Sequence, residues 1–185
     1  MSNQILMFLL DNLLGLFSLA LLLRFYMQWL RIPHYHPVSR FIVTVTDFIV
    51  RPARRWIPGW RGMDLSTLVL AWFTQFILLL GLSFLHGQSG DSLLGLGLLA
   101  LVAIARLTLM ILLVSIIMQA VLSWINPQNP LMPLLESVTQ PLLDIFRRVI
   151  PPIANVDLSP LFALLLLQVL LMFIGNLQYQ IASWL

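Results

Sequence analysis

Four long apolar stretches constrain this chain more than any motif does. They cover residues of about 5–30, 65–85, 93–125 and 158–178. A helix needs about 20 apolar residues to cross the roughly 30 Å hydrocarbon core of a bilayer, and each stretch reaches that length. Charged residues make up only 9% of the chain, whereas a soluble domain needs about 25%. The sequence therefore predicts an all-α membrane protein with four transmembrane helices.

Two further segments, residues 37–57 and 130–150, lie between the first and second spans and between the third and fourth. Apolar and polar side chains recur in both with the helical period, which is typical of an amphipathic helix lying in the membrane interface. Packing of these helices against the spans is one alternative interpretation, and shallow re-entrant segments, which leave the same pattern, are another. Pro141 is expected to kink or divide the second helix, because proline removes a backbone donor.

The two halves of the chain repeat each other. At a shift of 93 residues the matched positions are Pro37 and Pro130, Thr46 and Thr139, Arg54-Arg55 and Arg147-Arg148, Asp64 and Asp157, Ser66 and Ser159, and Gln75 and Gln168, while Gln28 meets Gln119 with a two-residue slip. We expect one repeat over residues 1–92 and a second over 93–185, each arranged helix–interfacial helix–helix. Each repeat has an even number of spans, so both enter the membrane in the same direction, as parallel repeats do.

Arginine placement predicts the orientation. All ten basic residues are arginine; six lie in residues 31–64 and two in 126–157, whereas residues 86–91 contain none. Because cytoplasmic loops of inner-membrane proteins are enriched in basic residues, we expect both long segments to be cytoplasmic and both termini periplasmic. The start, Met1–Gln4, carries no basic residue, so we interpret the first stretch as a span in a bacterial inner membrane and not as a cleaved signal peptide.

One motif occurs in both repeats. It reads Arg54-Arg55-x-Ile57-Pro58 followed by Asp64-Leu65-Ser66, and Arg147-Arg148-x-Ile150-Pro151 followed by Asp157-Leu158-Ser159. With this motif present twice, the chain resembles the YggT family of small bacterial membrane proteins over essentially its whole length. The duplicated arrangement is similar to the proteobacterial form of that family. The resemblance implies a membrane location, with links to osmotic stress or potassium homeostasis, to envelope organisation and, in plastid relatives, to cofactor assembly.

Arginines and tryptophans near the predicted interface are candidate ligands for anionic lipid. They are Arg51, Arg54, Arg55, Trp56, Trp60, Arg147 and Arg148. An arginine near an anionic membrane surface contributes about 1 kcal/mol, and tryptophan favours the headgroup region. The alternative is that these arginines only fix the topology.

The repeated Asp-x-Ser element precedes the second and fourth spans. Asp64, Ser66, Asp157 and Ser159 are of the residue types that cap the exposed amides of a helix, and Pro160 suits a first turn. We therefore expect helix caps. The alternative is a cation or proton site formed by the two aspartates.

Seven polar residues lie within or near the spans: Asp11, Arg24, Gln28, Gln75, Arg106, Gln119 and Gln168. A charge at the bilayer centre costs about 2.5–3.5 kcal/mol even on lenient scales. We expect Arg24 to extend towards the cytoplasmic surface and Asp11 to pair with Arg106. The glutamines are expected to bond one another or a neighbouring chain. Lining a polar path is the alternative for all seven.

Several residue types and motifs that catalysis or metal binding would need are absent from the sequence. The chain has no cysteine, which excludes disulfides, thiolate metal sites and covalent haem attachment. It shows no nucleophile–base set, phosphate loop or metal-binding motif, so we expect neither an enzyme nor a metal or cofactor. Its arginines cluster at helix ends, where lipid headgroups and not nucleic acid are the expected partner.

These features favour a non-catalytic inner-membrane scaffold or accessory subunit. Such a protein would join a membrane protein complex, binding another membrane protein or itself, and anionic lipid. The first alternative is a small oligomeric channel or transporter for osmotic or ion homeostasis. The second is an assembly factor for a membrane-bound cofactor protein.

Overall fold

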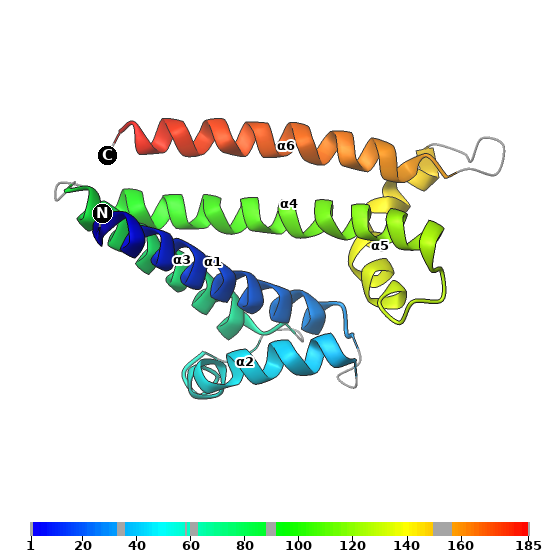
Figure 1. Cartoon of the computed structure of the whole chain (residues 1–185), viewed down its shortest axis with the longest axis horizontal. Helices are drawn as coiled ribbons and strands as arrows, with labels where there is room; N and C mark the ends of the chain where they lie inside the picture. Colours follow the sequence, from blue (N-terminus) through cyan, green and yellow to red (C-terminus); the bar gives the residue numbers. More distant parts are fainter. Residues whose placement is uncertain are drawn as a thin grey trace. The chain divides into compact units, whose positions relative to one another are not determined.

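The chain folds into helices. The computed structural model describes residues 2–32, 36–57, 59, 63–87, 92–149 and 157–184. The helices in this part of the chain are α1 (Ser2–Trp29), α2 (Pro37–Ala53), α3 (Leu65–His86), α4 (Leu93–Ile125), α5 (Met132–Val149) and α6 (Ser159–Ala182). Four of them, α1, α3, α4 and α6, are long and apolar enough to cross a membrane. The prediction of an all-α protein with four spans is therefore confirmed (Figure 1).

Helix α5 continues through Pro141, the residue at which the sequence predicts a kink or a division. Pro141 lies inside it without ending it, so the helix is not divided there. The side chain of Pro141 is on the exposed side of α5. Proline in a helix interior removes one backbone hydrogen bond and costs about 3 kcal/mol, while α5 buries Leu135, Val138, Thr139 and Leu143 on its packed face.

The helices form two compact units that are described separately. The first comprises residues 1–107 together with 176–185, and the second comprises residues 108–175. Helix α4 contributes to both units, as does α6.

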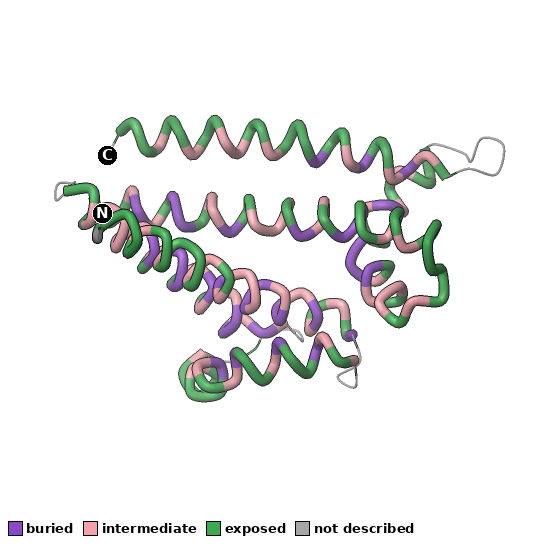
Figure 2. Tube along the Cα trace, viewed as in Figure 1, coloured by how far each residue is buried: buried purple, intermediate pink, exposed green. Residues whose placement is uncertain are grey.

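Packing of α1 against α3 forms the core of the first unit. Leu21 and Leu22 of α1 and Ala71 of α3 are almost fully buried. Ser18 donates a hydrogen bond from its hydroxyl to the carbonyl of Ala71 at 3.3 Å. Small residues at such contacts let two helix backbones approach closely, which is how membrane helices gain packing energy. The buried residues of α1 begin at Ser18, in its C-terminal half (Figure 2).

The beginning of α4 belongs to the same unit. The indole N–H of Trp72 donates to the carbonyl of Gly97 at 3.1 Å. A Cβ atom added at Gly97 would lie 3.7 Å from the Trp72 ring, which is ordinary contact distance. This bond between α3 and α4 satisfies an indole donor that lipid could not satisfy.

Helix α2 places different residues on its two faces. Ser39, Ile42, Thr46 and Val50 are buried at spacings of three or four residues, whereas Phe41 and Phe48 are about 70% exposed. Exposed aromatic side chains suit a headgroup region, where amphipathic helices lie. The helix therefore packs one mixed face against the protein and leaves its aromatic face largely exposed, although the Phe48 ring lies 5.6 Å from that of Phe17 in α1.

The second unit has a smaller core. Ile116 of α4, Leu143 of α5, and Ala163 and Leu167 of α6 bury their side chains in one cluster. Helix α5 buries Leu135, Val138 and Thr139 on the same side as Leu143. One face of α5 is thereby used for packing, as in α2.

Candidate functional site

Arg24 is buried in the first unit and faces α2. Its side chain is only 6% exposed. The guanidinium donates from Nη1 to the Thr46 hydroxyl at 2.8 Å and to the Val43 carbonyl at 3.3 Å, and from Nη2 to Asp47 Oδ1 at 2.9 Å. Helix α2 therefore supplies the partners that this buried charge needs, while the expected extension of Arg24 towards the cytoplasmic surface stays a prediction.

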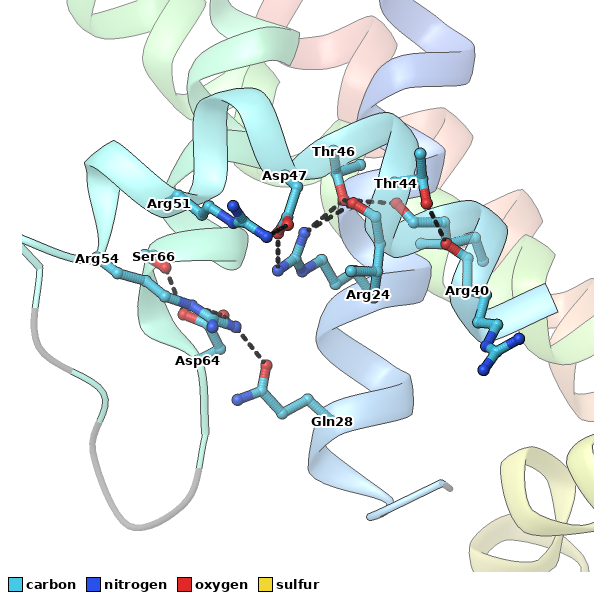
Figure 3. Close-up of polar contacts among 12 residues, drawn as sticks. Arg24, Gln28, Arg40, Thr44, Thr46, Asp47, Arg51, Arg54, Asp64 and Ser66 are labelled. Carbon is cyan, nitrogen blue, oxygen red and sulfur yellow. Dashed lines mark hydrogen bonds and ion pairs between the residues drawn. The ribbon is translucent and has the colours of Figure 1, made fainter. Parts of the chain in front are cut away.

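Asp47 is shared by two arginines. Besides Arg24, Arg51 contacts it from the next turn of α2, with Nη2 at 2.7 Å from Oδ2. Figure 3 shows both guanidinium groups converging on this carboxylate. The hydrogen bond from Arg24, together with the charges of Arg24 and Arg51, outweighs burial and lowers the pKa of Asp47.

Arg54 and Asp64 form another ion pair in the first repeat, which we call the first clamp. Nε and Nη2 of Arg54 lie 2.9 and 2.5 Å from Asp64 Oδ2. Arg54 Nη2 also donates to Gln28 Oε1 at 3.1 Å, and the Ser66 hydroxyl donates to the other oxygen of Asp64 (Figure 3). The first clamp therefore joins the region after α2 to the start of α3 and the end of α1.

The second repeat contains the equivalent contact, the second clamp. Arg147 Nε lies 2.9 Å from Asp157 Oδ2, and the amide of Ser159 donates to Asp157 Oδ1 at 2.9 Å. Burial alone would raise the pKa of Asp157, but its contacts with Ser159 and Arg147 outweigh burial and lower it. Asp157 is 41% exposed in this pair, whereas Asp64 is only 3% exposed. The two clamps share residue types and differ in burial.

The clamps refine the role expected of the Asp-x-Ser elements. Asp64 is the N-cap residue of α3, yet its side chain makes no cap hydrogen bond. It accepts from Arg54 and Ser66 instead, and its backbone carbonyl accepts from the Thr67 hydroxyl. Asp157, by contrast, accepts the amide of Ser159. Side-chain capping is thus seen at Asp157 and not at Asp64, because the carboxylate oxygen that accepts the Ser159 amide in the second repeat accepts the Ser66 hydroxyl in the first.

Two of the four glutamines, Gln28 and Gln119, bond the segments beside the spans. Gln28 accepts from Arg54, and Gln119 accepts from the Thr139 hydroxyl at 2.6 Å. Gln75 is buried on α3, and Gln168 is exposed on α6. The expected glutamine–glutamine contacts are not among those of the described residues.

Asp11 and Arg106 do not form the expected ion pair. Asp11 is exposed, in the half of α1 that precedes the first buried residue, Ser18. Arg106 donates from Nη1 to Gln178 Oε1 at 3.1 Å. Arg106 bonds α6 instead, and sequence periodicity could not reveal this partner because it lies 72 residues away.

Several interfacial candidates are exposed. Arg55, Trp56 and Arg148 lie at the surface, and in the described part of the chain neither arginine has an ion-pair partner. Trp60 lies outside the described residues.

Sequence reasoning missed Thr46 and Asp47 as partners of Arg24. The duplication of Thr46 as Thr139 and of Gln28 as Gln119 was the available signal for a polar contact between the first helix of each repeat and the helix after it.

Two open clefts accompany these contacts. The basic cleft, of about 650 Å³, lies in the first unit and is lined by Arg24, Met27, Gln28, Ser39, Arg40, Val43, Thr44, Asp47, Arg51 and Arg54. The repeat-2 groove, of about 860 Å³, lies in the second unit between α4, α5 and α6, and its polar lining residues include Gln119, Ser123, Glu136, Arg147 and Gln168. In the described part of the chain no three His, Asp or Glu side chains are grouped as metal ligands. The basic cleft thus offers guanidinium donors, and the repeat-2 groove offers amide, hydroxyl and charged groups beside apolar walls.

Comparisons with known proteins agree with the duplicated architecture. The chain matches the CCB3/YggT family model twice, at residues 3–85 and 98–178. It is 36% identical over 177 residues to an uncharacterized protein of Pseudomonas aeruginosa, covering 94% of this chain and 90% of that protein. It is 34% identical over 168 residues to the uncharacterized protein YggT of Escherichia coli K12, covering 88% and 85%. No solved structure matches.

Proposed function

The chain belongs to the CCB3/YggT family, and from that premise we propose that it is a non-catalytic scaffold or accessory subunit of the inner membrane. It binds another membrane protein and anionic lipid. In this proposal the long segments 31–64 and 126–157 face the cytoplasm and the termini face the periplasm. A membrane-impermeant maleimide tests the orientation: His86→Cys, at an exposed position, should be labelled from outside and Ser137→Cys should not.

One observation carries the proposal: most polar groups of the spans are occupied by contacts within the chain. The pairs are Arg24 with Asp47, Gln28 with Arg54, Arg106 with Gln178, and Gln119 with Thr139. A channel needs such groups free to replace the water around an ion. Groups that hold helices together instead support a rigid framework with a structural role.

The repeat-2 groove supports a partner-binding surface. Gln168 is exposed at its wall, although the amide of glutamine is costly to expose to lipid. Ser123 and Trp124 at the end of α4 are exposed as well. A transmembrane helix carrying a hydrogen-bonding side chain would satisfy these groups, which lipid tails cannot do.

The chain is well suited to a crosslinking test because it contains no cysteine. A single Ser123→Cys substitution places a benzophenone-maleimide probe on the groove, and Val121→Cys is the matched control. Residues two apart on a helix point about 200° apart, and Val121 is itself 48% exposed. We expect irradiation of native membranes to link position 123, and not position 121, to a different membrane protein.

Crosslinks would contradict the proposal in two cases. One is equal labelling of the same polypeptides from both positions, which would indicate random collision. The other is crosslinking from position 123 only to a second copy of this chain or to lipid, which would favour a homo-oligomer and redirect attention to ion flux.

A further inference from the structure

We propose that the basic cleft of the first repeat is a binding site for a phosphate group, supplied by the headgroup of an anionic phospholipid or by free phosphate. The inference rests on the lipid-binding part of the proposed function and assigns it to one site in one repeat. The site is formed by α1 and α2, with Arg40, Arg51 and the hydroxyl of Ser39 as the groups available to a ligand.

The cleft keeps an excess of positive charge after its internal ion pairs are formed. Four arginines line it: Arg24, Arg40, Arg51 and Arg54. Asp47 is shared by two of them and Asp64 is held by Arg54, so two carboxylates face four guanidinium groups. Arg40 has no ion-pair partner among the described residues, and the side chain of Arg51 is 78% exposed. These two arginines can therefore donate further hydrogen bonds to an anion.

Ser39 provides an independent observation. Its side chain is 2% exposed and lines the cleft, yet its hydroxyl has no hydrogen-bond partner among the described residues. Buried hydroxyl groups are almost always hydrogen-bonded, because leaving one unpaired costs free energy. A ligand oxygen in the cleft would supply the missing partner.

Comparison between the repeats shows that this charge is not part of the common framework. At the 93-residue shift the second repeat has Pro133 for Arg40, Glu136 for Val43 and Asp144 for Arg51. Its equivalent cleft, of about 260 Å³, contains Glu136 beside Arg147. The clamps recur in both repeats, but the free arginines do not. Both arginines line the same cleft, Arg40 near the start of α2 and Arg51 near its end, which indicates a role in the first repeat beyond holding the helices.

A phosphate is the anion that fits these groups best. Arginine presents its donors in a planar fork that matches phosphate oxygens, and the hydroxyl adds one more donor. The cleft volume of about 650 Å³ accommodates a glycerophosphate headgroup. The exposed aromatic face of α2, with Phe41 and Phe48, would place the attached acyl chains beside the helix.

The test uses the purified full-length chain after delipidation in neutral detergent, without any partner protein. Native mass spectrometry measures retention of short-chain phosphatidylglycerol, and of diacylglycerol with the same chains but no phosphate. Inorganic phosphate is titrated separately, with the thermal shift as readout. The variants are Ser39→Ala and the double substitution Arg40→Gln, Arg51→Gln. Arg24 and Arg54 are left intact because they hold the helices together.

We expect the double substitution to weaken phosphatidylglycerol binding about tenfold or more, since two charge-assisted contacts are lost. Ser39→Ala should weaken it as well without lowering the stability of the ligand-free protein, because the unpaired hydroxyl is removed. Arg148→Gln is the control: it removes the same charge from an exposed arginine outside the cleft and should change binding less than about twofold.

Each outcome bears on the site itself. If phosphatidylglycerol is retained and the cleft variants weaken its binding more than Arg148→Gln does, the ligand is a lipid headgroup. If only inorganic phosphate shows this order of effects, the site binds a soluble phosphate. Equal retention of diacylglycerol, or equal effects of Arg148→Gln and the cleft variants, would overturn the proposal. Because the titration contains no partner protein, a failed search for a partner would leave its result unchanged.

Discussion

At the scale of single residues, the Arg24–Asp47 contact shows how a charge is tolerated on a membrane-spanning helix. The Arg24 side chain is 6% exposed, and its charge is neutralised by a carboxylate from α2. The sequence identified Arg24 as costly but did not reveal its partner. The partner is 23 residues away, and the contact depends on how α2 folds back. The internal repeat could not indicate this partner either, because the second repeat has Gln140 where the first has Asp47.

Replacement of Asp47 by asparagine should destabilise the protein strongly. The variant leaves Arg24 buried without a counter-charge, which costs about 3 kcal/mol when one partner of a buried pair is removed. Asp144→Asn is the matched control, because its pair with Arg147 is 3.6 Å long and about half exposed; it should cost less than about 1 kcal/mol. The measurement is the free energy of unfolding in mixed micelles. Equal losses in both variants would contradict the role assigned to Arg24.

The pH dependence of stability follows from the lowered pKa of Asp47. A carboxylate whose pKa is lower in the folded protein stabilises the fold above its unfolded pKa of about 4, and this contribution is lost as the pH falls through the folded pKa. We expect unfolding free energy to be flat from pH 7 to pH 5 and to decline below about pH 4. Asp47→Asn should show a smaller decline, and an identical decline in both proteins would refute this assignment.

The two clamps allow a comparison between repeats. Asp64→Asn should cost about 1.5–3 kcal/mol, the usual range for a hydrogen bond to a charged group, because this carboxylate is buried against Arg54. Asp157→Asn should cost about 0–1 kcal/mol, because that pair is nearly half exposed. The measurement is the free energy of unfolding of each single variant relative to the unsubstituted protein. A larger loss at Asp157 would show that the second clamp matters more than its exposure indicates.

At the scale of helices, hydropathy and periodicity predicted the spans and the two amphipathic helices because length and pattern are local properties. They did not predict which face of α2 packs on the protein. Ser39 and Thr46 are buried although they are polar, and Phe41 and Phe48 are exposed although they are aromatic. For an amphipathic helix of this kind, the polarity of a side chain does not predict whether it faces the protein or the lipid. Both surroundings accept a face that carries polar and apolar side chains together.

The bond between α3 and α4 provides a prediction at this scale. Trp72→Phe removes the donor to the Gly97 carbonyl while keeping most of the aromatic contact. We expect a loss of about 0.5–1.5 kcal/mol, the net value of one hydrogen bond. Trp124→Phe is the control, because Trp124 is 91% exposed and should change stability little. Unfolding followed in the same micelles distinguishes them, and equal effects would exclude a specific role for the Trp72 bond.

At the scale of the whole molecule, duplication produced two repeats with a common framework and different surfaces. The clamp is present in both, at Arg54–Asp64 and Arg147–Asp157. The first repeat adds a basic cleft, and the second has an open groove between α4, α5 and α6. Motif repetition could predict the framework, because the same residues recur. It could not predict the clefts, because they depend on residues that differ between the repeats.

Native mass spectrometry of the protein purified from its own membrane in mild detergent tests the central claim most directly. The scaffold account predicts an intact particle that contains this chain and a second membrane protein in a fixed ratio, with the partner lost when the repeat-2 groove is altered by Ser123→Trp. A particle whose mass is a whole multiple of this chain, with lipid as its only companion, would contradict the account.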